Sequence, residues 1–157
     1  MPFLNKQASY FSFILFIRLL LSLIFIFSGL EKLIHPPEEF MMALKGYHLL
    51  PEFLVRPMAT LFPWLELLSG TFLFIGLFYS ISVLMVGSLL LVFTLAIGST
   101  LVRGIPLEDC GCFKSLGFRE SGSTALVRNV ILLLFWLNLY LYKDNRLTVD
   151  QWLKAKE

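Results

Sequence analysis

Cysteine and charge are both scarce in this chain of 157 residues. Two cysteines are present, charged residues make up 15% of the sequence, and the formal net charge at pH 7 is only +2. The small net charge and the lack of a lysine and arginine cluster argue against a nucleic-acid partner. The sequence also lacks a glycine-rich phosphate loop and a zinc-protease helix motif. None of these common soluble classes is therefore indicated.

Apolar residues dominate instead, at 57% of the chain with a mean hydropathy of +0.79. This composition is typical of a membrane protein in contact with lipid. Inside a bilayer only a helix satisfies its own backbone polar groups, and a crossing needs roughly 20 mainly apolar residues. The sequence therefore predicts an all-α polytopic bundle of four transmembrane helices, with residues 1–157 forming one membrane domain. The predicted crossings are residues 13–34, 58–78, 81–101 and 124–142.

The short connections and the charges predict the topology. So few residues, around Tyr79 and Ser80, separate the second and third crossings that these must form an antiparallel hairpin. The first apolar run is too long for a signal peptide and no cleavage site follows it, so we expect it to be retained. Lysine and arginine are almost evenly divided between the two sides. Small residues either let helices approach closely or simply face lipid, and the candidates are Gly70, Gly87, Ser88, Gly98 and Ser99.

Cysteine chemistry suggests the orientation that charge leaves open. Four crossings place both termini on one side and both long loops on the other. Because a disulfide persists more readily outside the reducing cytosol, we expect the cysteine loop to be periplasmic and the termini to be cytoplasmic. The predicted location is the inner membrane of a bacterium.

The first loop carries a helical pattern of its own. Pro36 and Pro37 stop the first crossing and supply a proline suited to the first turn of a new helix. Apolar residues then recur at helical spacing from Phe40 to Tyr47, which predicts a short helix in the headgroup region, ended by Pro51. Such a helix either covers the mouth of the bundle or acts as a lid over a substrate entrance.

Charged residues inside the apolar runs are candidate functional groups. Glu66 and Arg128 lie at depths that differ by about 5 Å when counted from the loop side. A buried charge is costly without a partner, so we predict an ion pair between them on the inward faces of their helices. Arg18 enters from the opposite side, where we expect it to snorkel to the headgroups. Glu31 and Lys32 are interpreted as ordinary interfacial charges.

The two cysteines stand one residue apart, in the sequence Asp109-Cys110-Gly111-Cys112-Phe113. A disulfide needs its Cα atoms about 4.4 to 6.8 Å apart, and Gly111 permits the turn that brings them there. A bond in so small a ring is expected to be strained, and strained exposed disulfides tend to be exchangeable. Bridging near neighbours removes little loop entropy, so a structural staple is a weak explanation. The pair is the natural redox centre.

The order of these motifs resembles the DoxX-like membrane proteins, and within them the branch named for the methylamine-utilisation protein MauE. The resemblance implies a redox-associated membrane protein, and the namesake is linked to maturation of the disulfide-rich small subunit of methylamine dehydrogenase. One departure is that Lys114 follows Phe113, where relatives often have glycine. The matching residues are Arg18, Ser28-Gly29-Leu30-Glu31-Lys32-Leu33, His35-Pro36, Phe40, Tyr47-His48-Leu49-Leu50-Pro51, Pro63-Trp64-Leu65-Glu66, Gly70, Asp109-Cys110-Gly111-Cys112-Phe113 and Val127-Arg128-Asn129.

Three function classes follow from these observations. The first is a membrane thiol–disulfide oxidoreductase in which Cys110 and Cys112 exchange electrons between a periplasmic partner protein and a membrane quinone or second dithiol. The second is a non-catalytic assembly factor or scaffold. The third is a soft-metal site, since thiolates select copper(I) or zinc. Further ligands for that metal would come from His35, His48, Met41 and Met42.

Overall fold

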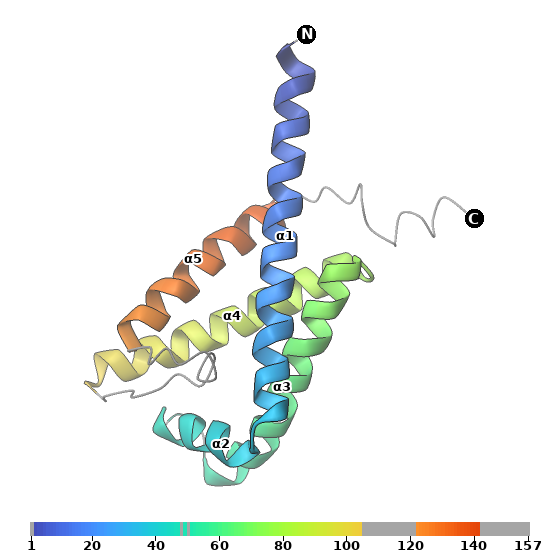
Figure 1. Ribbon diagram of the computed structural model, residues 1–157. Helices are drawn as coiled ribbons and strands as arrows, with labels where there is room; N and C mark the ends of the chain where they lie inside the picture. The colour runs from blue at the N-terminus through green and yellow to red at the C-terminus, as the bar shows by residue number, and fades with distance from the viewer. Residues whose placement is uncertain (1, 48, 50, 105–121, 142–157) are drawn as a thin grey trace.

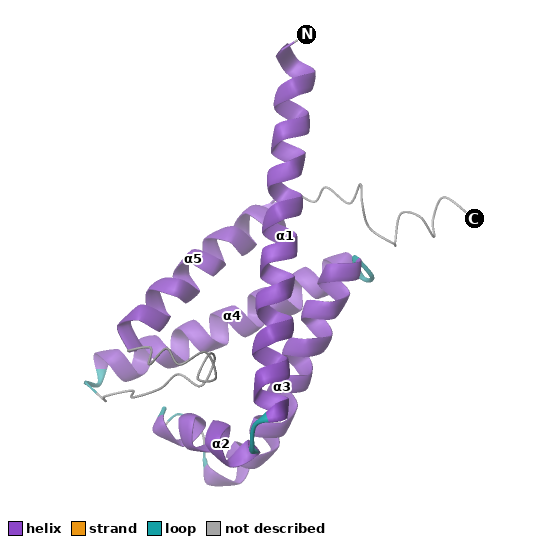
Figure 2. Ribbon diagram, in the orientation of Figure 1, coloured by secondary structure: helices purple, strands orange, loops and turns teal. Residues whose placement is uncertain are grey.

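The computed structural model describes residues 2–47, 49, 51–104 and 122–141. These residues form helices and short connections without any strand, which confirms the all-α prediction (Figure 2). Cys110 and Cys112 lie outside the described residues. The helices are α1 (Pro2–Ile34), α2 (Pro37–Gly46), α3 (Glu52–Ile75), α4 (Tyr79–Val102) and α5 (Gly122–Leu141).

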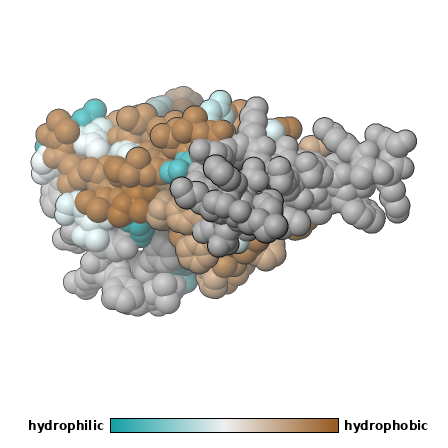
Figure 3. Space-filling view, turned by 90° about the horizontal axis from the view of Figure 1, so that it is seen from above, coloured by the Kyte–Doolittle hydropathy of each residue, from teal (hydrophilic) through white to brown (hydrophobic). Residues whose placement is uncertain are grey.

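Four of these helices are long and apolar enough to cross a membrane, namely α1 from Ser12 onward, α3, α4 and α5. Large apolar side chains such as Phe27 and Leu95 are exposed on the outside of the bundle, where lipid would cover them. Figure 3 shows broad apolar patches on the described surface seen from above. The chain is therefore a multi-pass membrane protein.

The second crossing differs from its predicted span of 58–78. Helix α3 begins earlier, at Glu52, and ends earlier, at Ile75. Its first turns contain charged residues that lie outside the apolar run, so hydropathy alone placed its start too late. Pro57 and Pro63 both lie inside α3, as transmembrane helices tolerate when neighbouring groups satisfy the freed backbone.

The helices form two main pairs. Helix α1 packs chiefly against α3, and α4 packs chiefly against α5, while the α3–α4 hairpin joins the pairs. Figure 1 shows α4 and α5 steeply inclined to α1, with the first turns of α1 projecting beyond the other helices. Helix α2 lies across the opposite end of the bundle, which we call the loop end because the connections to α2 and from α4 to α5 begin there.

The turn of the hairpin lies at residues 76–78, slightly before the predicted Tyr79–Ser80. Gly76 adopts a left-handed conformation with φ of 78°, which costs glycine little and ends α3 there. The N–H groups of Gly76 and Leu77 both donate to the carbonyl oxygen of Phe72, at 2.8 and 3.0 Å. The turn is therefore a helix C-cap, and α4 starts directly after it at Tyr79.

Close helix approach depends on only some of the small residues. A Cβ atom at Gly29 would lie 2.7 Å from the backbone nitrogen of Leu67, so α1 and α3 touch there through their backbones. A Cβ atom at Gly87 would collide with the Trp136 ring of α5. A Cβ atom at Gly98 would have its nearest neighbour at 4.0 Å, so this glycine is not a site of close helix approach.

The predicted interfacial helix is confirmed as α2. Pro36 precedes it and Pro37 occupies its first turn, while it ends at Gly46, before Pro51. Phe40 and Leu44 of α2, together with Tyr47 just after its end, are buried in one apolar cluster. The partners of these residues on α3, α4 and α5 are Val55, Ala59, Ile97 and Ala125. Helix α2 therefore covers the loop end of all three helices.

Candidate functional site

A buried ion pair joins α1 to α3 near the loop end. The Lys32 Nζ atom donates to both carboxylate oxygens of Glu66, at 2.6 Å to Oε1 and 2.8 Å to Oε2. The side chains are only 2% and 3% exposed. Two full charges withdrawn from water this far are costly unless they are paired and their remaining hydrogen-bonding capacity is used.

Further groups complete the surroundings of the ammonium. The Ser28 hydroxyl accepts from Lys32 Nζ at 3.2 Å and donates to Glu66 Oε2 at 3.1 Å. Ser28 and Lys32 are four residues apart, so they share one face of α1. The rings of Phe40 from α2 and Phe93 from α4 lie 5.0 and 4.9 Å from Nζ, within the range of cation–π attraction. Four helices thus contribute to one site.

The observed partner of Glu66 is Lys32, where the sequence led us to expect Arg128. Lys32 itself is buried, so its interpretation as an interfacial charge was wrong. The physical reason is that depth along a helix does not give the direction of a side chain. Lys32 lies on the α1 face that packs on α3, next to the Phe40 ring of α2. Arg128 lies on the wall of the same pocket as Glu66, and a direct bond between them stays a prediction.

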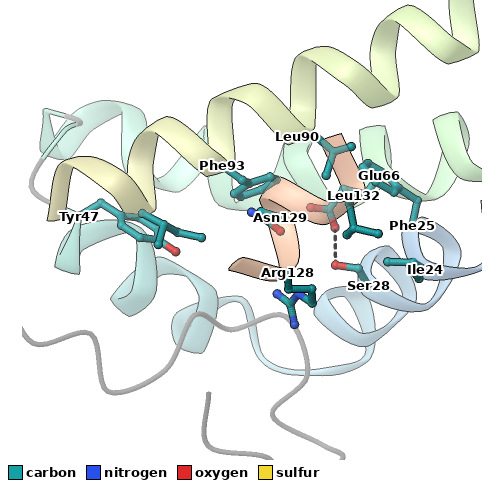
Figure 4. A pocket seen from close by; sticks show the side chains of 11 residues that line it. Ile24, Phe25, Ser28, Tyr47, Glu66, Leu90, Phe93, Arg128, Asn129 and Leu132 are labelled. Carbon is teal, nitrogen blue, oxygen red and sulfur yellow. Dashed lines mark hydrogen bonds between the residues drawn. The ribbon is translucent and has the colours of Figure 1, made fainter. Parts of the chain in front are cut away.

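This pocket lies among α1, α3, α4 and α5, with Tyr47 at the end of α2 (Figure 4). The pocket is partly open and has a volume of about 40 Å³. Its polar side chains come from Ser28, Glu66, Arg128 and Asn129, and Figure 4 shows the Glu66 carboxylate and the Asn129 amide directed toward the same space. The remaining lining is apolar and consists of Ile24, Phe25, Leu90, Phe93, Ile97 and Leu132.

Arg18 forms a second buried cationic site, at the far end of α1. Its Nε atom donates to the carbonyl oxygen of Leu73 at 2.8 Å, and its Nη2 atom donates to that of Phe74 at 3.1 Å. The guanidinium also lies 5.6 Å from the centre of the Tyr79 ring. Arg18 is buried, so the expectation that it snorkels to the headgroups was wrong. The last carbonyls of α3 need donors that lipid cannot supply.

The cysteine segment is flanked by described residues at the loop end. Helix α4 ends at Val102 and α5 begins at Gly122, and residues of the second turn of α5 line the pocket. The segment that carries Cys110 and Cys112 therefore starts and finishes at the end of the bundle that holds the Lys32–Glu66 pair.

The residues named for a soft-metal site are only partly described. His48 lies outside the described residues, and His35 Nδ1 is 2.9 Å from the Glu31 carbonyl oxygen. No group of three or more histidine, cysteine, aspartate or glutamate side chains suited to a metal occurs within residues 2–47, 49, 51–104 and 122–141. This part of the chain gives the metal interpretation no support of its own.

Comparison with known proteins identifies the family. The model described as "Methylamine utilisation protein MauE" matches residues 10–142. The chain belongs to the MauE family. Curated MauE proteins are similar to it: 36% identical over 112 residues in Methylorubrum extorquens AM1, 32% over 117 in Paracoccus denitrificans and 33% over 100 in Methylophilus methylotrophus. No solved structure matches the chain.

The MauE relatives are longer than the region shared with this chain. The three alignments cover 71%, 74% and 64% of this chain but 59%, 62% and 52% of the relatives. The MauE family match contains both the buried ion pair and the cysteine pair. Membership therefore agrees with the resemblance that the motifs indicated, and applies to the part of the chain that carries the site.

Proposed function

We propose that this chain is a membrane thiol–disulfide exchange protein that supports maturation of a periplasmic partner through Cys110 and Cys112. By the names of its relatives, its setting would be methylamine utilisation, and the disulfide-rich small subunit of methylamine dehydrogenase is one client. The proposal includes a bacterial inner membrane, with the cysteine loop periplasmic and the termini cytoplasmic.

One observation carries the proposal: the two cysteines of the sequence lie between α4 and α5, whose flanking ends are at the same end of the bundle as a buried charged site. A bundle of lipid-facing helices has little use for a buried lysine, glutamate and serine cluster, and intramembrane ionisable residues are by default functional candidates. Thiol exchange needs proton acceptors and positive charge near the sulfur atoms. Glu66 and Arg128 line the pocket toward the loop end and supply one group of each kind.

The exchange itself needs no added oxidant. A Cys110 or Cys112 thiolate attacks a partner disulfide, a mixed disulfide forms, and the second cysteine displaces the partner's thiolate, which takes up a proton. The chain then holds the disulfide and the partner holds two thiols, or the reverse, according to their reduction potentials. A second dithiol protein or a membrane quinone resets the pair; the quinone would accept two electrons and two protons as it becomes the quinol.

Trapping in cells tests this proposal. Replacing Cys112 with serine should leave Cys110 unable to resolve a mixed disulfide, so acid quenching and alkylation should capture a covalent complex that reductant releases. Cys110→Ser is the matched variant, and the double serine variant is the control that should trap nothing. We expect loss of function in all three with normal amounts of folded protein. Full function in the double variant would contradict the proposal and favour a scaffold.

Impermeant thiol reagents test the orientation separately. Applied to intact spheroplasts, a charged maleimide should label Cys110 and Cys112 from outside. Labelling confined to inverted vesicles would place the cysteine loop in the cytoplasm and remove the periplasmic partner from the proposal.

A further inference from the structure

Only part of the Lys32–Glu66 cluster faces the pocket. Glu66 and Ser28 line the pocket, whereas Lys32 does not. The ammonium is enclosed by the carboxylate, the Ser28 hydroxyl and the two aromatic rings. Anything that enters the pocket therefore meets the carboxylate of the pair and not its ammonium.

The size and lining of the pocket suit water. A volume of about 40 Å³ exceeds the roughly 10 to 15 Å³ that a pocket needs to hold a water molecule. A buried water needs two to four polar partners, and Glu66, Ser28 and Asn129 provide them on three helices.

The pocket leads toward the loop end of the bundle. Arg128 lies one turn nearer the start of α5 than Leu132, and Tyr47 lies at the end of α2. The charged and titratable groups that line the pocket with Glu66 are Arg128 from α5 and Tyr47 from α2, while Lys32 from α1 contacts its carboxylate directly. Helix α4 contributes only the apolar side chains of Leu90, Phe93 and Ile97.

We propose that the pocket is a hydrated proton-exchange site, in which water bound by Glu66, Ser28 and Asn129 connects the Lys32–Glu66 pair to the loop side. An excess proton delivered along that water binds the Glu66 carboxylate and leaves by the same path, and Lys32 is the positioning residue that holds the carboxylate at the wall of the pocket. The ligand is water, and no electron is transferred. The site is independent of the cysteines and would persist if they proved non-catalytic.

Cysteine scanning tests the hydration of the pocket. Single cysteines would be placed in the full chain with Cys110 and Cys112 replaced by serine, and their reaction with 2-aminoethyl methanethiosulfonate measured in lipid nanodiscs. Ser28→Cys and Asn129→Cys face the pocket. Their sequence neighbours Phe27→Cys and Val130→Cys are the matched controls, because Phe27 and Val130 are 64% and 44% exposed on the outer surface.

A thiol reacts with this reagent as the thiolate, which forms only where water reaches it. We expect the two buried pocket positions to react at least tenfold faster than their more exposed, lipid-facing neighbours. Equal or slower reaction at the pocket positions would mean that the pocket is dry and would overturn the proposal.

Infrared spectroscopy supplies a second measurement that does not depend on the cysteine variants. Lys32→Met should leave Glu66 without a counter-ion, so the carboxyl should take up a proton and show a carbonyl band that shifts in D₂O. The band should be missing from Lys32→Arg, wild type and the Lys32→Met/Glu66→Gln double variant. Failure of the band to appear, or to shift in D₂O, would overturn proton exchange at this site.

Discussion

Helix α1 carries two buried cations, Arg18 and Lys32, and each finds a different kind of hydrogen-bond acceptor on α3. They lie 14 residues apart, or about 21 Å along the helix, and each is 6% exposed. Both donate hydrogen bonds to α3. Arg18 donates to two backbone carbonyls, whereas Lys32 donates to a carboxylate.

The nature of the acceptor separates the two roles. A backbone carbonyl takes no proton and cannot change its charge, so Arg18 can only join α1 to the end of α3. A carboxylate can take a proton, and Glu66 also lines a pocket. The comparison teaches that a buried charge indicates function when its partner can titrate and can be reached by another molecule.

Removing one member of the Lys32–Glu66 pair should have the largest effect. Glu66→Leu leaves the Lys32 ammonium unpaired in the bundle, and Lys32→Leu leaves Glu66 either charged or forced to take up a proton, so each should lower the free energy of unfolding by about 3 to 5 kcal/mol. The double Leu variant should recover most of that loss, because no charge remains. Unfolding in mixed micelles would measure all three variants.

The activity of the double Leu variant then shows whether the Lys32–Glu66 pair differs in role from Arg18. If the double Leu variant regained stability without activity, the pair would belong to the mechanism. Recovery of both would make Lys32 and Glu66 as structural as Arg18.

Removing Arg18 should have the next largest effect. Arg18→Met leaves the carbonyls of Leu73 and Phe74 without their donors, which should cost about 2 to 4 kcal/mol for the two acceptors together. Because no titrating group is lost from the pocket, activity per folded molecule should stay at the wild-type level. Thermal unfolding and a complementation assay normalised to folded protein would check this. If Arg18→Met lost activity while keeping full stability, Arg18 would also have a functional role and would not differ from Lys32 in this respect.

A smaller effect is expected from Gly29→Ala, which pushes α1 away from α3 near Lys32 while leaving the Arg18 end in place. The new methyl group meets backbone atoms of Pro63 and Leu67, so we expect a loss of about 1 to 3 kcal/mol. Gly98→Ala is the matched control, since it has room and removes a glycine from a helix interior, with a gain of up to about 1 kcal/mol. Equal stability of the two variants in thermal unfolding would show that the α1–α3 contact is looser than the structure indicates.

The sequence was sufficient to predict the parts of the fold that depend on composition. Apolar runs predicted four crossings and α2, and the isolated glutamate in the second run predicted that Glu66 would be buried with a partner. The identity of the partner needed two facts that hydropathy does not contain: the rotation of α1 about its axis and the position of α2 over Lys32. A cue was available, since Ser28 and Lys32 share one helix face.

The Arg18 site could not have been found in the same way. Its acceptors are backbone carbonyls, which every residue has, so no side-chain pattern marks them. The end of α3 was also predicted three residues too late, at 78, so the carbonyls of Leu73 and Phe74 were not expected to lie in the last turn of the helix. Only the left-handed conformation of Gly76 fixes where that helix ends.

The charged contacts of α1 also bear on how the protein enters the membrane during synthesis. Both cations of the first crossing are matched by groups on the second, with Glu66 only 34 residues after Lys32. A lone lysine, arginine or aspartate at the centre of a crossing costs about 2.5 to 3.5 kcal/mol on insertion, and pairing removes much of that cost. We therefore expect α1 to stay at the insertion machinery until α3 emerges, so that the two helices enter lipid together with Lys32 paired to Glu66 and Arg18 hydrogen-bonded to the end of α3.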